Sequence, residues 1–309
     1  MPSLSLLALL VALLAQYAWP EPGRQRLHAF YGRMCLSASK RLNAGDRNSG
    51  MLAWIALMGA VLVPVGLLAA LAAALHPVFL WAFDALVLFG TLRFLGTTGE
   101  VAAIERALRE GDVAAAANRL GHWQGEPVDS EDPGSVARLA AEQALSEAHH
   151  GAFAPLFWFL VLPGPLGLVL HPLARRAART WEQGVEPDER DFGWFAARAF
   201  HAIDWVPQRL TAFAFAVVGD FEDALYCWRS QAAQWLRSGD GIVLASGAGA
   251  LGVRLGDPVA RSGTLVDRPA LGTGEPAREE ALASLEGLLW RALVVWLLVF
   301  LLAASLQLA

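Results

Sequence analysis

The pattern of hydrophobic and polar positions along this chain is dominated by long apolar runs. A helix needs about 20 apolar residues to cross the hydrocarbon core of a bilayer. Four runs approach or exceed this length and are predicted as transmembrane helices: residues 3–19, 51–75, 78–96 and 288–308. We therefore expect an all-α, polytopic integral membrane protein with four to five transmembrane helices.

A further apolar run, residues 152–173, is interrupted near its middle. Pro163, Gly164 and Pro165 divide it into halves of about ten residues, and each half is too short to cross alone. A full crossing would place the arginines that follow it outside, whereas a re-entrant hairpin keeps them inside. The hairpin is the favoured prediction. The run 205–219 is too short to be assigned as a span.

Basic residues set the orientation of the spans. Cytoplasmic loops carry an excess of Lys and Arg, and the segment between the first two runs has such an excess. Its basic residues are Arg24, Arg26, Arg33, Lys40, Arg41 and Arg47. The N-terminus is therefore predicted outside the cell and the central region in the cytoplasm.

The polar parts of the chain predict one membrane domain, 1–309, with two cytoplasmic regions. The first is a helical insertion at 97–150, with one helix over 99–121 and a second that begins at Ser135 as its N-cap. The second region, 237–280, is rich in glycine, so we expect a loop there.

Composition agrees with a membrane protein and argues against other classes. Hydrophobic residues make up 55% of the chain and charged residues 17%, well below the charged fraction of a soluble domain. The net charge of −5 argues against nucleic acid as a partner, because a duplex is bound by clustered Lys and Arg. Cys35 and Cys227 lack the spacing of a zinc site or a disulfide framework.

Some polar side chains stand beside or within apolar runs. Asp84 lies inside a predicted span, where a charge is costly and has either a function or a partner such as Arg93. Asp204 and Arg209 flank Trp205 at the start of an apolar run. An interfacial position, with Trp at the headgroups and Arg reaching toward them, explains that pattern without chemistry.

Another polar group closes the second cytoplasmic helix. Glu142, Glu147, His149 and His150 come together just before the interrupted run. One interpretation is a metal or phosphate site. The alternative is a solvated helix end, at which the imidazoles are favoured by the negative pole of the helix dipole.

Four stretches resemble, in order, segments of the adenosylcobinamide-phosphate synthases of the CobD/CbiB family. They are LREGDVAAAANRLGHWQG (108–125), EQALSEAHHGAFAPLFW (142–158), DFGWFAARAFHAIDWVPQRLTA (191–212) and GAGALGVRLGDPVARSGTLVDRPALG (247–272). The last stretch is the most specific of the four. On these stretches the chain is identified as a divergent member of the family.

The resemblance implies a role in cobalamin biosynthesis at the bacterial inner membrane. The family enzyme joins a carboxylate of cobyric acid to aminopropanol phosphate, using ATP and Mg²⁺. Such chemistry rests on positioning and charge stabilisation. Mg²⁺ and ATP are expected here only if the synthase activity is retained, and no resident metal site is expected.

The chain departs from the family at acidic positions. Phe200 and His201 replace a pair of Asp residues that follows the AAR triplet. Ser146, Glu147 and His150 replace a Glu, an Asn and an Asp. Because apolar and glycine positions are kept while acids are lost, these departures favour a retained fold and argue against full catalytic competence.

A second resemblance supports a non-enzymatic alternative. Residues 203–219, IDWVPQRLTAFAFAVVG, are similar to a segment of AmpE-type inner-membrane proteins, which are linked to β-lactamase induction. The alternative function is therefore a membrane sensor or modulator that binds an anionic amphiphile. The expected partners are a corrinoid precursor or another anionic amphiphile, the lipid bilayer and a second copy of the chain.

Both hypotheses use one polar site, formed if the matched segments come together. Its expected catalytic residues are Glu142, Glu147 and Asp204, and its expected ligand-binding residues are His149, His150, Arg209, Arg254, Gly249 and Gly252. Imidazoles and guanidiniums suit a phosphorylated or carboxylated ligand better than a Mg²⁺ cage. For Arg254 the alternative is a simple ion pair with Asp257.

Overall fold

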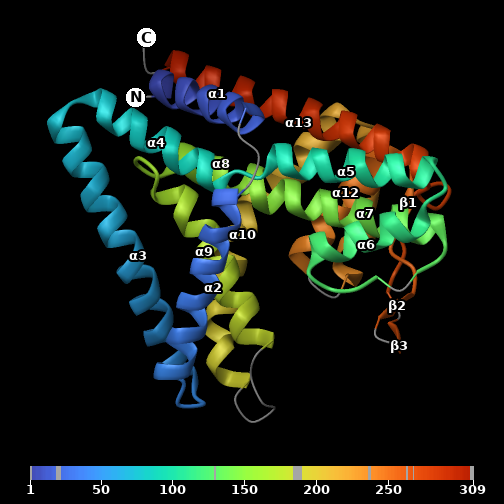
Figure 1. The fold of residues 1–309 in the computed structure, drawn as a ribbon, viewed down its shortest axis with the longest axis horizontal. Coiled ribbons are helices and arrows are strands. Elements are labelled where there is room, and N and C mark those ends of the chain that lie inside the picture. The colour runs from blue at the N-terminus through green and yellow to red at the C-terminus, as the bar shows by residue number, and fades with distance from the viewer. Residues whose placement is uncertain are drawn as a thin grey trace. The chain divides into compact units, whose positions relative to one another are not determined.

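The computed structural model describes residues 2–18, 22–128, 130–183, 190–235, 238–261, 264–266 and 268–306. Nearly all of its secondary structure is helical, and the described strands have two or three residues each (Figure 1). The predicted all-α class is therefore confirmed. The chain divides into two compact units: unit 1 comprises Met1–Leu92, His150–Val206 and Leu298–Ala309, and unit 2 comprises Arg93–His149 and Pro207–Leu297.

Unit 1 is assembled from helices of both halves of the chain. Its helices are α1 (Pro2–Ala18), α2 (Pro22–Leu42), α3 (Arg47–Leu75), α4 (Pro77–Thr91), α8 (Ala154–Val161) and α9 (Leu166–Gln183). A π-helical turn, η1 (His149–Phe153), precedes α8. Two further helices, α10 (Arg190–Val218) and α13 (Glu279–Leu306), each contribute residues to both units.

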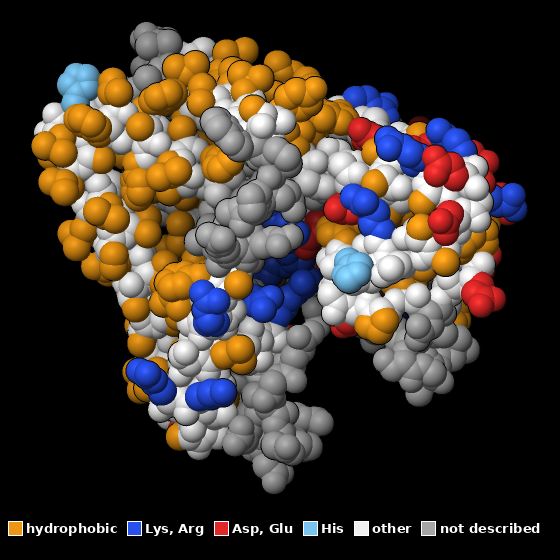
Figure 2. All heavy atoms as spheres, in the orientation of Figure 1, with side chains coloured by type: hydrophobic (Ala, Val, Ile, Leu, Met, Phe, Trp, Pro, Cys, Tyr) orange, Lys and Arg blue, Asp and Glu red, His pale blue; other side chains and the backbone are white. Residues whose placement is uncertain are grey.

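Helix α3 has the features of a membrane span. Asp46 caps its start, where the carboxylate accepts a hydrogen bond from the backbone N–H of Ser49 at 3.0 Å. Pro64 lies inside the helix without ending it, as membrane helices tolerate. Figure 2 shows hydrophobic side chains along α3 and basic side chains near one of its ends. This pattern is typical of a membrane span with basic residues near one end.

The lengths of the apolar helices support the membrane prediction. The described segments long and apolar enough to cross a bilayer are Arg47–Leu75, Pro77–Arg109 and Glu279–Ala303. They contain or overlap three of the four predicted spans, and the last begins earlier than expected. The remaining predicted span, 3–19, forms the shorter apolar helix α1.

The interrupted run forms a helical hairpin. Helices α8 and α9 are joined by a turn at residues 162–165, in which Gly164 has a φ of +59°. The two helices pack so closely that a Cβ atom on Gly167 would lie 2.2 Å from the backbone oxygen of Trp158. The predicted break at the Pro-Gly-Pro sequence is therefore the turn of this hairpin.

Cysteine labelling in intact cells tests whether the hairpin is re-entrant. In unit 1, α2 packs against α9, and the Arg176 guanidinium of α9 lies beside Gly32 of α2. We expect cysteines introduced at Arg176 and Lys40 to react with an impermeant maleimide from the cytoplasmic side only. Burial raises the pKa of Cys35 to about 11, which keeps background labelling low. Labelling of the two positions from opposite sides would contradict the hairpin.

The core of unit 1 lies where α2, α3, α9 and α10 meet. Trp181 of α9 is fully buried there, and its indole N–H donates to the backbone oxygen of Cys35 at 2.9 Å. Its ring packs on Phe192 of α10 with 5.0 Å between centroids. This core fixes α9 and α10, the helices that carry His171 and Asp204.

Unit 2 combines helices with two short β-ladders. Its elements are α5 (Phe94–Arg109), α6 (Val113–Gln124), α7 (Pro133–Ala148), α11 (Phe221–Gln231), η3 (Ala232–Gln234), α12 (Ser238–Leu251), β1 (Arg254–Leu255), β2 (Val259–Arg261), β3 (Thr264–Val266) and β4 (Leu271–Gly272). The pairs β1–β4 and β2–β3 are both antiparallel. These strands were not predicted from the sequence.

Two predictions for the helices of the 97–150 region were wrong in detail. The single helix expected over 99–121 is two helices, α5 and α6, because Gly111 adopts a φ of +78° and Asp112 caps the start of α6. The N-cap of α7 is Asp132 and not Ser135, since the Asp132 carboxylate accepts from the backbone N–H of Ser135 at 2.8 Å.

The loop expected over 237–280 begins with a helix. Residues Ser238–Leu251 form α12, and its small residues allow a close approach to α11. A Cβ atom on Gly249 would lie 2.5 Å from the backbone oxygen of Asp223. Glycine was thus interpreted as a loop former where it serves helix packing. Beyond α12, pairing of β1 with β4 shapes the remaining segment.

Candidate functional site

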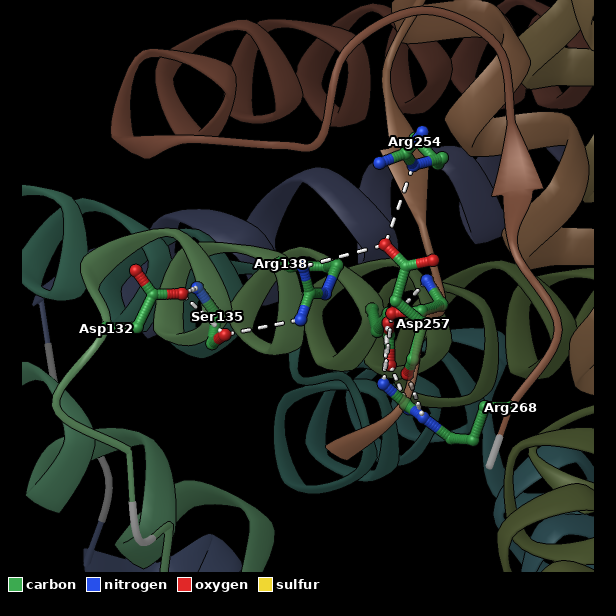
Figure 3. Close-up of polar contacts among 8 residues, drawn as sticks. Asp132, Ser135, Arg138, Arg254, Asp257 and Arg268 are labelled. Atoms are coloured by element: carbon green, nitrogen blue, oxygen red, sulfur yellow. Dashed lines mark hydrogen bonds and ion pairs between the residues drawn. The ribbon is translucent and has the colours of Figure 1, made fainter. Parts of the chain in front are cut away.

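A set of charged residues in unit 2 comes from three places in the chain (Figure 3). Helix α7 supplies Arg138 and Glu142. Strand β1 and the turn after it supply Arg254 and Asp257, and the segment before β4 supplies Arg268. We call these five residues the arginine cluster. The pairing of β1 with β4 and the contact of β1 with α7 bring them together.

Glu142 and Arg268 form the buried part of the cluster. Their side chains are 9% and 8% exposed. Arg268 donates through Nη1 to Oε2 of Glu142 at 2.6 Å and through Nη2 to Oε1 at 3.3 Å. The backbone N–H of Gly256 donates to Oε1 at 2.9 Å. Both oxygens of this predicted catalytic carboxylate are therefore engaged within the protein.

Asp257 joins the other arginines. Its Oδ2 lies 3.5 Å from Nε of Arg254 and 3.8 Å from Nη1 of Arg138. The pair of Arg254 with Asp257, expected as the alternative to ligand contact, is thus present. Asp257 has a φ of 67°, which is uncommon for a residue other than glycine. Residues held in such conformations cluster at ligand sites and switches.

The network continues to the start of α7. The Ser135 hydroxyl donates to Oδ2 of Asp132 at 2.6 Å and accepts from Nη2 of Arg138 at 3.3 Å. The bond from the Ser135 hydroxyl, followed by that from the Ser135 backbone N–H, holds the pKa of Asp132 below its usual value. Ionised Asp132 therefore helps to fix Arg138 through the Ser135 hydroxyl.

The charge of the arginine cluster suits an anion. Within the five residues of the cluster, three guanidiniums face the carboxylates of Glu142 and Asp257, which leaves one positive charge in excess; Asp132 reaches Arg138 only through the Ser135 hydroxyl. The side chain of Arg254 is 43% exposed, whereas that of Arg138 is 11% exposed. Arg254 is thus the guanidinium best placed to meet a ligand from solvent, and its planar fork matches a phosphate or carboxylate.

The cluster does not fit as a magnesium site. Mg²⁺ is usually held by one or two carboxylates together with water and substrate phosphates. Glu142 and Asp257 each already face guanidinium groups, and Glu147 lies 3.2 Å from Nη1 of Arg93. The phosphates of a nucleotide match this setting better than the metal ion does.

Two other predicted residues of unit 2 have partners away from the cluster. Glu147 pairs with Arg93, the residue that the sequence offered as one partner for Asp84; Asp84 and Arg93 belong to different units. Nδ1 of His149 lies 2.9 Å from the Thr211 hydroxyl, and both side chains are buried. Glu147 and His149 therefore have structural partners, whatever further role they have.

The remaining ligand-binding predictions differ in their surroundings. Arg209 is half-buried in α10, and burial lowers its pKa. Gly249 packs against the backbone of α11, so a ligand has no room to approach its Cα atom from that side. Gly252 follows α12 with a φ of +65°, and a Cβ atom there would meet nothing within 4 Å. Of the two glycines, Gly252 leaves more room for a ligand.

In unit 1, Asp204 lies between two imidazoles. Nε2 of His171 is 2.8 Å from Oδ1 of Asp204, and Nδ1 of His150 is 4.0 Å from Oδ2. All three side chains are at most 4% exposed. The expected single site containing Glu142, His150 and Asp204 together stays a prediction, because these residues belong to different units.

Two important partners, Arg268 and His171, were not predicted from the sequence. Arg268 was not selected, although a cation before Pro-x-Leu-Gly belongs to the fourth resembling stretch and could have indicated it. His171 was not selected, because it lies in the interrupted apolar run 152–173 outside the four resembling stretches and has no polar neighbour in the sequence that would mark it. Their partners, Glu142 and Asp204, lie 126 and 33 positions away along the chain.

A cavity in unit 2 has a different character. It has a volume of about 1150 Å³ and lies between α6 and the segment that follows it. Its lining includes Asp112, Glu126, Glu131 and His122. Because three carboxylates border it, an anionic ligand is better matched by the arginine cluster.

Fold and site together define an all-α membrane protein with an arginine-rich polar site. The model of the CobD/CbiB protein family matches residues 9–289. The chain therefore belongs to the CobD/CbiB family, and the resemblance stated from the sequence is confirmed.

Similar proteins cover nearly the whole chain. Cobalamin biosynthesis protein CobD of Stutzerimonas stutzeri is 33% identical over 96% of this chain and 96% of its own length. The CobD of Chromobacterium violaceum is 32% identical over 98% of this chain and 97% of its own length. Cobalamin biosynthesis protein CbiB of Salmonella choleraesuis is 27% identical over 83% of this chain and 82% of its own length. No solved structure shows significant similarity.

Proposed function

We propose that this protein acts in cobalamin biosynthesis at the bacterial inner membrane, where it binds a corrinoid precursor during attachment of aminopropanol or its phosphate to cobyric acid. The observation that carries the proposal is the 33% identity, over 96% of both chains, with a protein named for cobalamin biosynthesis. Similarity over almost the full length favours a common function over a shared fragment.

The arginine cluster supports an anionic ligand for this role. Cobyric acid offers a carboxylate and aminopropanol phosphate offers a phosphate, and guanidinium groups bind either one by paired hydrogen bonds. Arg254 is the most exposed arginine of the cluster, and glycines with positive φ lie on both sides of its strand, Gly252 before β1 and Gly256 after it.

A second candidate is the AmpE-like membrane sensor. Glu142 is held by Arg268, and Glu147 lies beside Arg93. With these carboxylates engaged, the protein is suited to hold an anionic amphiphile without transforming it. This candidate shares the binding step with the first and differs in the absence of amide-bond formation.

Binding measurements on an Arg254→Lys variant test the anion contact. Lysine keeps the charge but loses the fork, so we expect affinity for cobyric acid to fall at least tenfold, about 1.4 kcal/mol. Calorimetry on purified protein in detergent gives the affinity. Arg109→Lys, an exposed arginine paired with Glu105, is the matched control. An affinity within about twofold of wild type for Arg254→Lys would show that the contact does not exist.

A further inference from the structure

Three side chains in unit 1 combine metal-binding chemistry with close geometry. We propose that His150, His171 and Asp204 form a binding site for a divalent transition-metal ion. His171 approaches one carboxylate oxygen of Asp204 at 2.8 Å, and His150 approaches the other at 4.0 Å. The two imidazole rings are nearly parallel, with centroids 5.8 Å apart and an interplanar angle of 22°.

The distances suit a shared ion. Tetrahedral zinc has bonds of about 2.0–2.1 Å to nitrogen and oxygen, so its donor atoms stand roughly 3.3 Å apart. The observed separations of 2.8 and 4.0 Å lie on either side of that value. The two separations run to different oxygens of Asp204, so the proposal requires the His150 ring and the Asp204 carboxylate to rotate toward one ion.

The surrounding fold holds the donors in place. His150 lies in the π-helical turn η1, His171 in α9 and Asp204 in α10. Short π-helical segments occur frequently at functional sites. Phe200 packs against both imidazoles, with ring centroids 5.9 Å from His150 and 5.5 Å from His171. The donors are thus fixed by separate elements next to an apolar wall.

The donor set selects the kind of metal. Imidazole suits Zn²⁺, Co²⁺ and Fe²⁺, whereas Mg²⁺ and Ca²⁺ prefer oxygen ligands. One carboxylate offsets one of the two positive charges, which lowers the cost of burying the ion. In the metal-bound form, His171 presents the lone pair of Nε2, so its proton resides on Nδ1. The hydrogen bond between His171 and Asp204 is then replaced by two metal bonds.

The site is independent of the proposed role in cobalamin biosynthesis. It is built from carboxylate and imidazole groups of unit 1 and would bind a cation, whereas the arginine cluster of unit 2 would bind an anion. Metal content can therefore be measured without a corrinoid, and each proposal can fail while the other stands.

Metal titration of the purified full chain tests the site. The protein is treated with a chelator in detergent, titrated with Zn²⁺ or Co²⁺ alone, freed of excess ion and measured by elemental analysis. We expect one tightly held ion per chain and, with Co²⁺, a visible absorption band of a site with nitrogen and oxygen ligands. Excess Mg²⁺ is expected not to displace either ion.

Variants assign the ion to these residues. Asp204→Asn and His171→Gln are expected to weaken Zn²⁺ binding at least tenfold, whereas the control His201→Gln, at an exposed position of α10, is expected to bind like wild type. Zn²⁺ should also raise the melting temperature of wild type and control but not of the site variants. If wild type retains no ion, or if folded site variants retain it with unchanged affinity, the proposal is overturned. The wild-type titration decides the matter even if a variant does not fold.

Discussion

Replacement of Arg268 by methionine is expected to lower the free energy of unfolding by about 3–5 kcal/mol, since it leaves a buried carboxylate without its cation. The Glu142 side chain is 9% exposed, and the arginine meets both of its oxygens. Only the N–H of Gly256 would remain as a hydrogen-bond donor among these contacts. Denaturant unfolding of the purified protein in detergent gives the change.

A double variant separates loss of charge pairing from loss of packing. Removing both charges, with Glu142→Leu and Arg268→Met together, is expected to restore most of the lost stability, because no uncompensated charge stays buried. As a control, Arg119→Ala removes a more exposed pair with Glu100, in which the side chains are 49% and 32% exposed, and should change stability by at most about 1 kcal/mol. If the double variant is no more stable than Arg268→Met alone, the unpaired Glu142 carboxylate is not what destabilises the single variant.

Substitution of Gly50 by alanine is expected to destabilise unit 1 by more than the roughly 1–3 kcal/mol of ordinary overpacking. A Cβ atom at this position of α3 would lie 2.0 Å from the backbone oxygen of Phe192 in α10. A backbone atom cannot rotate away as a side chain can. The two helices must therefore separate, and a lower melting temperature and faster proteolysis of the variant would report this.

Gly59 provides the matched control within the same helix. A Cβ atom there would meet nothing within 4 Å, and alanine favours a helix over glycine by about 1 kcal/mol. Gly59→Ala is therefore expected to leave stability unchanged or to raise it slightly. Equal melting temperatures for Gly50→Ala and Gly59→Ala would contradict the close contact between α3 and α10.

The apolar helices could be predicted because the length of an apolar run, a local property of the sequence, determines where they form. Length and apolarity along the chain were enough for α3 and for the C-terminal helix, and Pro163, Gly164 and Pro165 were enough for the hairpin turn. The cap of α7 was placed three residues late, because Asp132 and Ser135 are both good capping residues. Only the backbone conformation distinguishes them.

The pairing of charges could not be predicted from local patterns. Glu142 was recognised as important from its position, but its partner Arg268 is set by β1–β4 pairing, which depends on two strands of two residues each. The helix α12 was missed because glycine reduces helix propensity locally. The stabilising contact that glycine allows in α12, the close packing of Gly249 on α11, forms only in the folded unit.

Growth of a bacterial strain that lacks its own CobD/CbiB-family synthase, supplied with cobyric acid as the corrinoid source, tests the proposed function most directly. We predict that expression of this chain restores cobalamin-dependent growth and that the Arg254→Lys variant, at equal abundance in the membrane, restores it poorly. Absence of growth from wild-type protein that is folded and inserted in the membrane would contradict a role in this step. Binding of cobyric acid without growth would instead favour the non-enzymatic sensor.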